Sequence, residues 1–237
     1  MDVLDLDWSF VNLSMLASAS VDNMIHIWNC CPANPVGDTG HRGPSTVATL
    51  PTHTRSILPP FKVLGGHISY VKGVSFDPIG RYLASAGGDN MVIIWDCDSW
   101  EPLHLLDGPL KNSLDRTIFR RLSWAPDGGS LCVTAAMKSS KPVGMVLKRG
   151  SWESVADLVG HESPSVCCKF CPTVLTSYSE SVADVVGFTG NREMTSSSPS
   201  CCVVLGDQEG LVGGLIVKCL KYFNICDFTS STIAWNR

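Results

Sequence analysis

Two short hydrophobic runs flank a polar turn at residues 83–95, which read L-A-S-A-G-G-D-N-M-V-I-I-W. Gly, Asp and Asn in the centre tolerate the backbone conformations of a tight turn, and the flanking runs suit buried strands. The pattern therefore predicts a β-hairpin. Residues 16–28 repeat this hairpin, and nine of the thirteen aligned residues are identical. A repeated hairpin predicts an architecture of stacked copies of one unit.

The spacing of the lead-in dipeptide Gly-His gives the length of the unit. It occurs at residues 66–67 and 160–161, which are 94 residues apart, and a weaker unit over 99–148 lies between them. Each repeat therefore has about 40–47 residues, the period of four-stranded propeller blades with Gly-His and Trp-Asp signatures. These signatures resemble those of the WD40 family, and the resemblance implies an all-β fold class: an incomplete WD40 β-propeller with about four blades plus the start of another, whose first inner strand would be 232–235.

The whole chain, residues 1–237, is predicted to form this partial propeller, with two interruptions. Residues 30–60 and 173–200 are each predicted to be a loop insertion. The first is rich in Pro, Gly and small polar residues and has no hydrophobic periodicity, and the second ends in T-S-S-S-P-S. The strands of the propeller therefore have to come from the remaining segments.

Composition limits the classes of function. The 237 residues are 44% hydrophobic and 17% charged, as in globular proteins, and no apolar run is long enough to span a membrane. The net charge of −4 lacks the basic excess of nucleic-acid binders, so direct DNA binding is not expected. No signal peptide is recognised, and the 11 cysteines are an odd number, so we expect free thiols in a reducing compartment.

The polar residues of the repeat resemble those of the WD40 family. There, the His of Gly-His, a Ser or Thr on the next inner strand, the Asp of the turn and the Trp of Trp-Asp form a hydrogen-bonded set within one blade. The resemblance assigns these structural roles to His67, Ser85, Asp89 and Trp95 in the second unit, and to Ser18, Asp22 and Trp28 in the first.

A hydrolase is the alternative interpretation of a Ser, a His and an Asp in one unit. It is not favoured, because the Ser lies inside a strand and no nucleophile-elbow motif accompanies it. A buried polar group is costly unless it is paired, so a fully bonded set would fix the geometry of the blade. We therefore predict no catalytic residues and no enzymatic activity.

Four segments carry a finer resemblance. They are D-V-L-D-L-D-W at 2–8 with the hairpin at 16–23, G-G-H-I-S-Y-V-K-G-V-S-F-D-P-I-G-R-Y-L-A-S at 65–85, F-R-R-L-S-W-A-P-D-G at 119–128, and R-G-S-W-E-S-V-A-D-L-V-G-H-E-S-P at 149–164. In this order they resemble the N-terminal propeller of the HIRA/Hir family of histone chaperone subunits. The third is shared with the WD40 subunit of chromatin assembly factor 1, and the fourth favours HIRA.

The HIRA resemblance implies a nuclear, non-catalytic scaffold for replication-independent nucleosome assembly and transcription regulation. The implied partners are a ubinuclein-like subunit and, through the complex, histones H3 and H4, with no cofactor, small-molecule substrate or membrane. It also implies that the family's first two blades, the opening of the third and most of the seventh are missing. A substrate-recognition propeller of a ubiquitin ligase is an alternative from another class, and a fragment without stable function is a third.

Partner contacts and a metal site are the remaining candidates. Arg120 and Arg121 lie in a strand predicted over 118–124, and by alternation one of them points away from the core, where it could touch an acidic partner or stay solvated. Trp100 and Trp152, on outer strands, are either partner anchors or packed between blades. Cys167, Cys168 and Cys171 resemble half of a zinc site, but a second pair at suitable spacing is lacking, so no metal is predicted.

Overall fold

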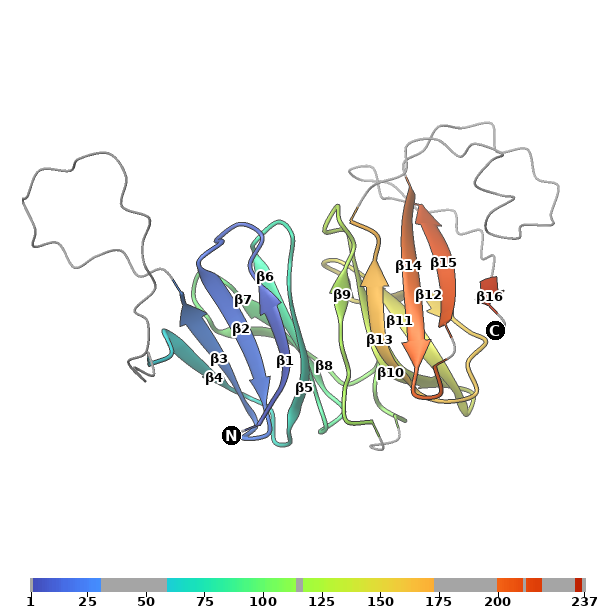
Figure 1. Cartoon of the computed structure of the whole chain (residues 1–237), viewed down its shortest axis with the longest axis horizontal. Coiled ribbons are helices and arrows are strands. Elements are labelled where there is room, and N and C mark those ends of the chain that lie inside the picture. Colours follow the sequence, from blue (N-terminus) through green and yellow to red (C-terminus); the bar gives the residue numbers. More distant parts are fainter. Residues whose placement is uncertain are drawn as a thin grey trace, which may run out of the picture.

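The computed structural model describes residues 2–30, 59–113, 117–172, 200–210, 212–218 and 233–235. Every regular element in these ranges is a β-strand, and they contain no helix that could cross a membrane. The strands form four antiparallel sheets of four strands each (Figure 1). This confirms the prediction of an all-β, incomplete propeller.

The four sheets follow one another along the chain and are numbered here in that order. Sheet 1 contains β1 (Val3–Trp8), β2 (Met15–Ser20), β3 (Met24–Asn29) and β4 (Lys62–Gly65). Sheet 2 contains β5 (Val71–Phe76), β6 (Tyr82–Gly87), β7 (Val92–Asp96) and β8 (Pro102–Leu106). Sheet 3 contains β9 (Ser123–Trp124), β10 (Ser130–Lys138), β11 (Lys141–Lys148) and β12 (Ser154–Leu158). Sheet 4 contains β13 (Ser165–Phe170), β14 (Ser200–Asp207), β15 (Val212–Lys218) and β16 (Ile233–Trp235).

The fourth strands of sheets 1 and 4 come long after the third strands in the sequence, and the one in sheet 4 corrects a prediction. In sheet 1, β4 pairs with β3, with Leu64 opposite Ile25, although residues 30–61 separate the two strands. In sheet 4, β16 pairs with β15 and completes that sheet, so Ile233–Trp235 does not begin a further blade. The two predicted loop insertions lie almost wholly outside the described residues.

Each sheet has two faces with different neighbours. We call the face toward the preceding sheet the incoming face and the face toward the following sheet the outgoing face. The outgoing face of sheet 1 and the incoming face of sheet 2 form one core cluster, made by Ala17, Ala19, Ile25, Ile27 and Leu64 on one side and by Val74, Phe76, Leu83, Ile93 and Trp95 on the other. Small residues on β2 leave room for the large rings and branched chains of sheet 2.

The same arrangement joins the later sheets. Ala84, Ala86, Val92 and Ile94 on the outgoing face of sheet 2 share a cluster with Leu122, Trp124, Leu131 and Val133 of sheet 3 and its lead-in. Cys132, Val146 and Leu158 of sheet 3 share another with Cys168, Phe170, Val203 and Leu205 of sheet 4. Burying each large side chain contributes roughly 1.5–3 kcal/mol, so these inter-sheet layers are the main source of stability.

Residues 118–122 depart from the predicted strand. Only Ser123–Trp124 pairs with β10. Just before this strand, the backbone N–H of Arg120 donates to the Lys72 carbonyl of sheet 2 at 3.1 Å, and that of Arg121 donates to the Val166 carbonyl of sheet 4 at 3.0 Å. The segment therefore bridges the innermost strands of two different sheets.

Candidate functional site

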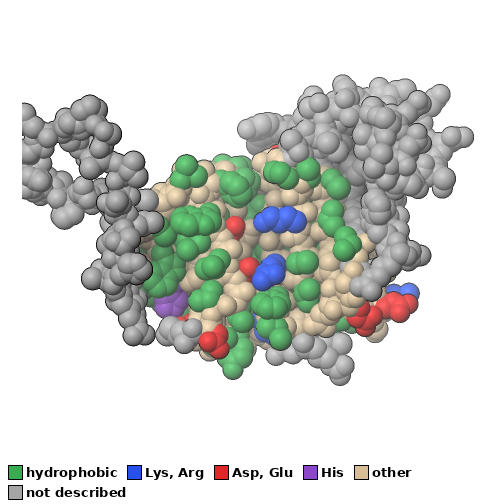
Figure 2. Space-filling model, viewed as in Figure 1, with side chains coloured by type: hydrophobic (Ala, Val, Ile, Leu, Met, Phe, Trp, Pro, Cys, Tyr) green, Lys and Arg blue, Asp and Glu red, His purple; other side chains and the backbone are tan. Residues whose placement is uncertain are grey.

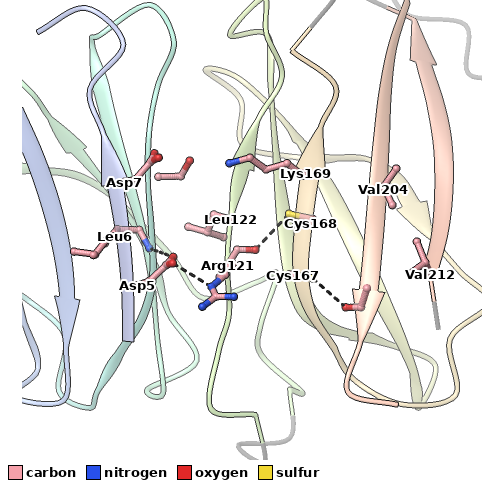
Figure 3. A pocket seen from close by; sticks show the side chains of 13 residues that line it. Asp5, Leu6, Asp7, Arg121, Leu122, Cys167, Cys168, Lys169, Val204 and Val212 are labelled. Atoms are coloured by element: carbon pink, nitrogen blue, oxygen red, sulfur yellow. Dashed lines mark hydrogen bonds and ion pairs between the residues drawn. The ribbon is translucent and has the colours of Figure 1, made fainter. Parts of the chain in front are cut away.

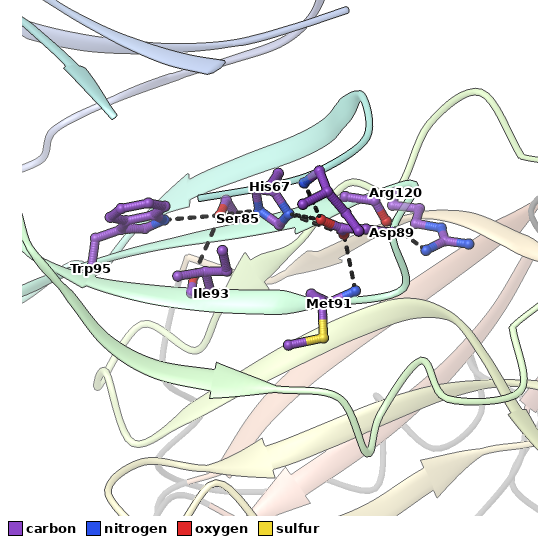
Figure 4. Close-up of polar contacts among 9 residues, drawn as sticks. His67, Ser85, Asp89, Met91, Ile93, Trp95 and Arg120 are labelled. Carbon is purple, nitrogen blue, oxygen red and sulfur yellow. Dashed lines mark hydrogen bonds and ion pairs between the residues drawn. The ribbon is translucent and has the colours of Figure 1, made fainter. Parts of the chain in front are cut away.

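Four residues of sheet 2 form a continuous hydrogen-bonded chain (Figure 4). The Trp95 Nε1–H donates to Ser85 Oγ at 2.9 Å, and Ser85 Oγ lies 2.8 Å from His67 Nε2. On the other side of the imidazole, His67 Nδ1 lies 2.9 Å from Asp89 Oδ2 and 3.0 Å from Oδ1. The hairpin brings Ser85 and Trp95 onto neighbouring strands, and the segment before β5 supplies the His.

The hydrogen-bonding capacities of these groups determine which one donates and which one accepts in each contact. An indole N–H can only donate, so Ser85 Oγ accepts from Trp95 and its own hydroxyl hydrogen can go to His67 Nε2. The imidazole then carries its hydrogen on Nδ1 and donates it to Asp89, a tautomer inferred from the bonding partners. Asp89 also accepts from the backbone N–H groups of Ile68, at 2.9 Å, and Met91, at 3.2 Å.

The electrostatics of Asp89 reflect these donors. Burial by itself would raise the pKa of its carboxyl group. The hydrogen bond from His67, the electrostatic attraction of that ring and the backbone N–H groups of Ile68 and Met91 outweigh burial and lower the pKa below 3.8. The carboxylate is therefore held ionised beside His67.

The contacts between Ser85, His67 and Asp89 follow the order of a hydrolase triad, but their burial argues against catalysis. Ser85 is 0% exposed, and the side chains of His67 and Asp89 are 1% and 2% exposed. A nucleophile has to be reached by a substrate carbonyl, whereas Ser85 Oγ is enclosed between His67 and the indole of Trp95. This geometry supports the structural role that the resemblance implied.

Sheet 1 contains a shorter version of this hydrogen-bonded set. The Trp28 Nε1–H donates to Ser18 Oγ at 2.9 Å, as Trp95 does to Ser85. Asp22 pairs with His26 of β3, with 3.1 Å between Oδ2 and Nε2. His26 was not predicted from the sequence, because the partner of this Asp was expected only in a Gly-His lead-in.

Sheet 4 contains only the His–Asp contact of the four-residue set seen in sheet 2. His161 Nδ1 lies 2.9 Å from Asp207 Oδ2, and the two side chains are 3% and 2% exposed. This pair was also missed. Its signals were present as the Gly-His lead-in at 160–161 and the Gly-Asp turn at 206–207, but the 44 residues between these two dipeptides hid the relationship.

The structure corrects the expectation that Arg120 contacts a partner. Its residue exposure is 0%, and its guanidinium donates to the Gly87 carbonyl at 2.7 Å, to Ser113 Oγ at 3.0 Å and to Thr117 Oγ1 at 3.5 Å. A planar guanidinium with several N–H donors suits this set of acceptors. Arg120 thereby ties the segment around Ser113 and Thr117 to the end of β6.

Arg121 is the exposed member of the pair. Its side chain is 46% exposed, its Nε donates to Asp5 Oδ1 at 3.1 Å, and its guanidinium lies 4.6 Å from the centre of the Phe119 ring. The ion pair connects the lead-in of sheet 3 to the innermost strand of sheet 1. Arg121 therefore has local partners, and part of it still faces solvent.

Trp100 and Trp152 are packed rather than free, which corrects their assignment as partner anchors. Each is only 8% exposed. The ring centre of Trp152 lies 5.9 Å from that of Tyr82 and 6.0 Å from that of Trp124. The ring centre of Trp100 lies 6.5 Å from that of Phe61. Of the two possibilities left open by the sequence, the structure shows packing near the outer strands.

The cysteines of β13 have different environments. Cys167 is exposed, whereas Cys168 is buried with its thiol 3.4 Å from the carbonyl oxygens of Arg121 and Cys132. Burial, followed by the neighbouring Cys132, raises the pKa of the Cys168 thiol. In the described part of the chain, no group of three or more His, Cys, Asp or Glu side chains is placed to hold a metal ion.

Exposed apolar side chains lie on the segments that lead into sheets 2 and 3. Ile68 is 87% exposed, Tyr70 53% and Ile118 63%. They lie on two segments that are connected by a buried hydrogen bond, in which Lys72 Nζ donates to the Thr117 carbonyl at 2.8 Å. We call Ile68, Tyr70 and Ile118 the loop-end patch.

Comparisons with known proteins agree with this geometry. The family model WD40, described as WD domain, G-beta repeat, matches residues 58–96, which include β4 to β7 and the hydrogen-bonded chain of sheet 2. Protein HIR1 of Mycosarcoma maydis is 31% identical over 208 residues, which is 88% of this chain and 16% of that protein. Protein HIR1 of Cryptococcus neoformans is 34% identical over 171 residues, 72% of this chain and 16% of that protein.

A third relative extends the match to another genus. Protein hir1 of Schizosaccharomyces pombe is 29% identical over 195 residues, 82% of this chain and 18% of that protein. The chain belongs to the HIR/HIRA family of WD40 proteins. This HIR-family chain spans less than a fifth of the length of these three relatives.

Proposed function

We propose that this HIR-family chain is a non-catalytic scaffold of a HIRA-like histone chaperone complex in the nucleus, acting in replication-independent nucleosome assembly and transcription regulation. The observation that carries the proposal is the similarity to HIR1 proteins over 72–88% of the chain. The proposed partners are a ubinuclein-like subunit and, through the complex, histones H3 and H4.

The environment of the polar residues supports a scaffold. The residues with the most chemical character, His67, Ser85, Asp89 and Arg120, are buried and bonded to other parts of the chain. A protein built in this way presents its partners with surface shape and apolar contact instead of a reactive group.

The loop-end patch is the proposed docking surface for the ubinuclein-like subunit. Ile68 and Ile118 expose most of their surface to solvent, and burying them in a complex would be favourable. Arg120 and Lys72 hold the backbone beneath the patch, so little ordering is required when a partner binds.

Affinity purification of the full chain from nuclear extract tests the function and the surface together. The double variant Ile68→Asp, Ile118→Asp is expected to recover at least about tenfold less of the ubinuclein-like subunit than the unmodified chain. The matched control is Leu103→Asp, Leu105→Asp, which changes two exposed leucines of β8, 46% and 61% exposed, and is expected to bind normally.

The outcomes separate the two parts of the proposal. If the unmodified chain recovers neither histones nor a ubinuclein-like subunit, the proposed function is wrong. If the chain and its patch variant recover them equally, the function stands and the patch is wrong. Recovery of a cullin adaptor instead would support the ubiquitin-ligase alternative.

A further inference from the structure

Strand β8 forms the outer edge of sheet 2. The order of this sheet is β5-β6-β7-β8, so β8 pairs with β7 on one side only. In an antiparallel ladder the backbone N–H and C=O groups of alternate residues point away from the paired strand. Sheet 1 and sheet 3 cover the two faces of sheet 2, so its outer edge is the part that is open to a partner.

The outer strands of the neighbouring sheets carry charged residues, whereas β8 does not. β4 contains Lys62, and β12 contains Asp157 in an ion pair. β8 reads P-L-H-L-L. Charged side chains on an edge strand discourage the addition of a further strand. Of the outer strands whose side chains the structure describes, β8 is therefore the least protected.

The side chains of β8 alternate between two surroundings. Leu105 pairs with Ile93, whose side chain belongs to the cluster shared with sheet 1. The His104 ring centre lies 5.6 Å from that of Trp152, on the side of sheet 3. Leu103 is 46% and Leu105 61% exposed. A strand added to β8 would therefore bring its own alternate side chains beside these two leucines.

The start of β8 limits the part that is available. Pro102 has no backbone N–H, and the pairing with β7 shifts in register beside it. Proline and bulges are both features that block strand addition. The available edge therefore consists of residues 103–106.

A carboxylate stands beyond each end of β8. Glu101 precedes the strand, Asp107 follows it, and both are exposed. Neither forms a salt bridge with another described residue. Two copies of β8 paired antiparallel would place Glu101 of one copy near Asp107 of the other, and like charges on paired strands are destabilising. The edge thus disfavours a second copy of this chain and favours a strand with a cation at each end.

The charged groups of the innermost strands differ, because they have partners within the chain. Figure 2 shows acidic and basic side chains next to each other in the middle of one face. In Figure 3 the Arg121 Nε donates to Asp5 Oδ1, at 3.1 Å. Asp5 and Asp7 also accept the backbone N–H groups of Val74 and Phe76. These carboxylates are therefore less available to a partner than Glu101 and Asp107.

We propose that β8 binds an extended segment of a partner protein by strand addition, and that this segment carries alternating apolar residues between two basic residues. Its backbone continues the ladder of sheet 2, its apolar side chains contact Leu103 and Leu105, and its cations lie near Glu101 and Asp107. The site is separate from the loop-end patch, and the proposal does not rest on the proposed function.

Binding of a designed peptide to the full chain tests the site. The probe is a fluorescently labelled peptide K-T-V-T-V-T-K, which is palindromic and so places lysines near both carboxylates in either strand orientation. Fluorescence anisotropy should show saturable binding, and the charge-reversed peptide E-T-V-T-V-T-E should bind about tenfold more weakly. No saturable binding of the first peptide up to about 1 mM would overturn the proposal.

Methylation of peptide backbone nitrogens distinguishes strand addition from other apolar contacts. One version of the probe is methylated on its threonine nitrogens, and another on its valine nitrogens. Alternate residues of a strand direct their N–H groups to the same neighbour, so one version should lose binding and the other should keep it. Equal binding of the two versions would contradict pairing with β8.

Substitutions on β8 locate the site. Leu103→Thr, Leu105→Thr retains strand-forming residues but removes apolar contact, and it should weaken binding of the lysine peptide about tenfold. Glu101→Gln, Asp107→Asn should weaken it about threefold and reduce its dependence on salt. Undiminished binding by the folded leucine variant would overturn the proposal.

The matched control makes the same kind of change in the loop-end patch. Ile68→Thr, Ile118→Thr replaces two exposed apolar residues and should bind the peptide as the unmodified chain does. Loss of binding in this variant would place the peptide on the patch and contradict the assignment to β8. Failure at β8 therefore leaves the proposed function untouched.

A measurement on the unmodified chain covers the case in which a variant fails to fold, as judged by circular dichroism. Backbone hydrogen exchange of β8 should slow when the lysine peptide is added, while exchange of β12 stays constant. Unchanged exchange of β8 at saturating peptide would overturn the proposal. Slowing of β8 with rising protein concentration, without peptide, would show pairing with a second copy and contradict the assigned partner.

Discussion

The indole nitrogen of Trp95 lies 2.9 Å from the hydroxyl oxygen of Ser85, which is the central connection of the buried polar chain in sheet 2. Ser85 accepts this bond and also contacts His67, so one hydroxyl joins the second hairpin strand to the lead-in of the blade. Removing it leaves two buried nitrogen groups without their partner. This relationship gives the first prediction.

Ser85→Ala is expected to destabilise the chain by about 1–3 kcal/mol, since Trp95 Nε1 and His67 Nε2 each lose a buried hydrogen-bond partner. Urea unfolding followed by tryptophan fluorescence measures the change. The control is Ser18→Ala, where Trp28 loses the same bond but is only partly buried, and the hydroxyl contacts the His26 carbonyl at 3.5 Å instead of an imidazole ring, so the loss should be smaller. Equal stability of Ser85→Ala and the unmodified chain would contradict the role assigned to this hydroxyl.

Asp89 should make stability depend on pH in acid. Its pKa is lowered in the folded state relative to 3.8, so it contributes stability above about pH 3.8 that is lost as the pH falls through its folded pKa. Asp89→Asn should lower the melting temperature at neutral pH and flatten its decline below pH 3.8. The control Asp98→Asn removes an exposed carboxylate after β7 and should keep the melting temperature of the unmodified chain at neutral pH. An unchanged slope in Asp89→Asn would contradict this prediction.

The adjacent residues Arg120 and Arg121 should respond very differently to the same substitution. Arg120→Lys keeps the charge but loses the planar set of donors to Gly87, Ser113 and Thr117, and we expect a loss of about 3 kcal/mol. Arg121→Lys alters a half-exposed ion pair with Asp5 and should cost less than about 1 kcal/mol. Equal losses in denaturant unfolding would show that burial does not distinguish the two residues.

Cys97 should be nearly unreactive in the folded chain. Burial, together with the charges of Asp77, Asp96 and Asp98, raises the pKa of its thiol from 9.0 to about 12. The thiolate is the reactive form, so at neutral pH alkylation should be about 1,000-fold slower than in the urea-unfolded chain. Mass spectrometry of the alkylated peptides, with the same cysteine in urea as reference, measures this ratio, and similar rates in both states would contradict it.

The repeated hairpin was predictable because its information is local. The turn at 87–90 and the Ser, Asp and Trp around it lie within 15 residues, and the registers Ser85–Ile93 and Leu83–Trp95 follow from a tight turn between two strands. The repeat itself then predicted the sheet architecture.

The environment of Arg120 was not predictable from alternation along a strand. Alternation correctly required one buried and one exposed residue at 120–121, but it left open which was buried and assumed a regular strand over 118–124. Residues 118–122 instead bridge sheets 2 and 4, and the acceptors of Arg120 include Gly87, which is 33 residues away. Contacts at this distance depend on how the sheets pack.

Asp5 and Asp7 illustrate the same limit. Their carboxylates accept backbone N–H groups of Val74, at 3.1 Å, and Phe76, at 2.7 Å, on the innermost strand of the next sheet. In sequence they are two acidic residues of an alternating strand, and nothing nearby indicates their partners 69 residues away. Sequence repeats predicted the blades, but not the polar groups that join one blade to the next.

Recovery of partners by the unmodified full chain from nuclear extract is the most direct measurement of the proposed scaffold function. We predict that the chain co-purifies with a ubinuclein-like subunit and with histones H3 and H4, and that the loop-end variant Ile68→Asp, Ile118→Asp loses the subunit while Leu103→Asp, Leu105→Asp retains it. A folded chain that recovers neither the subunit nor the histones would contradict the assignment to a histone chaperone complex.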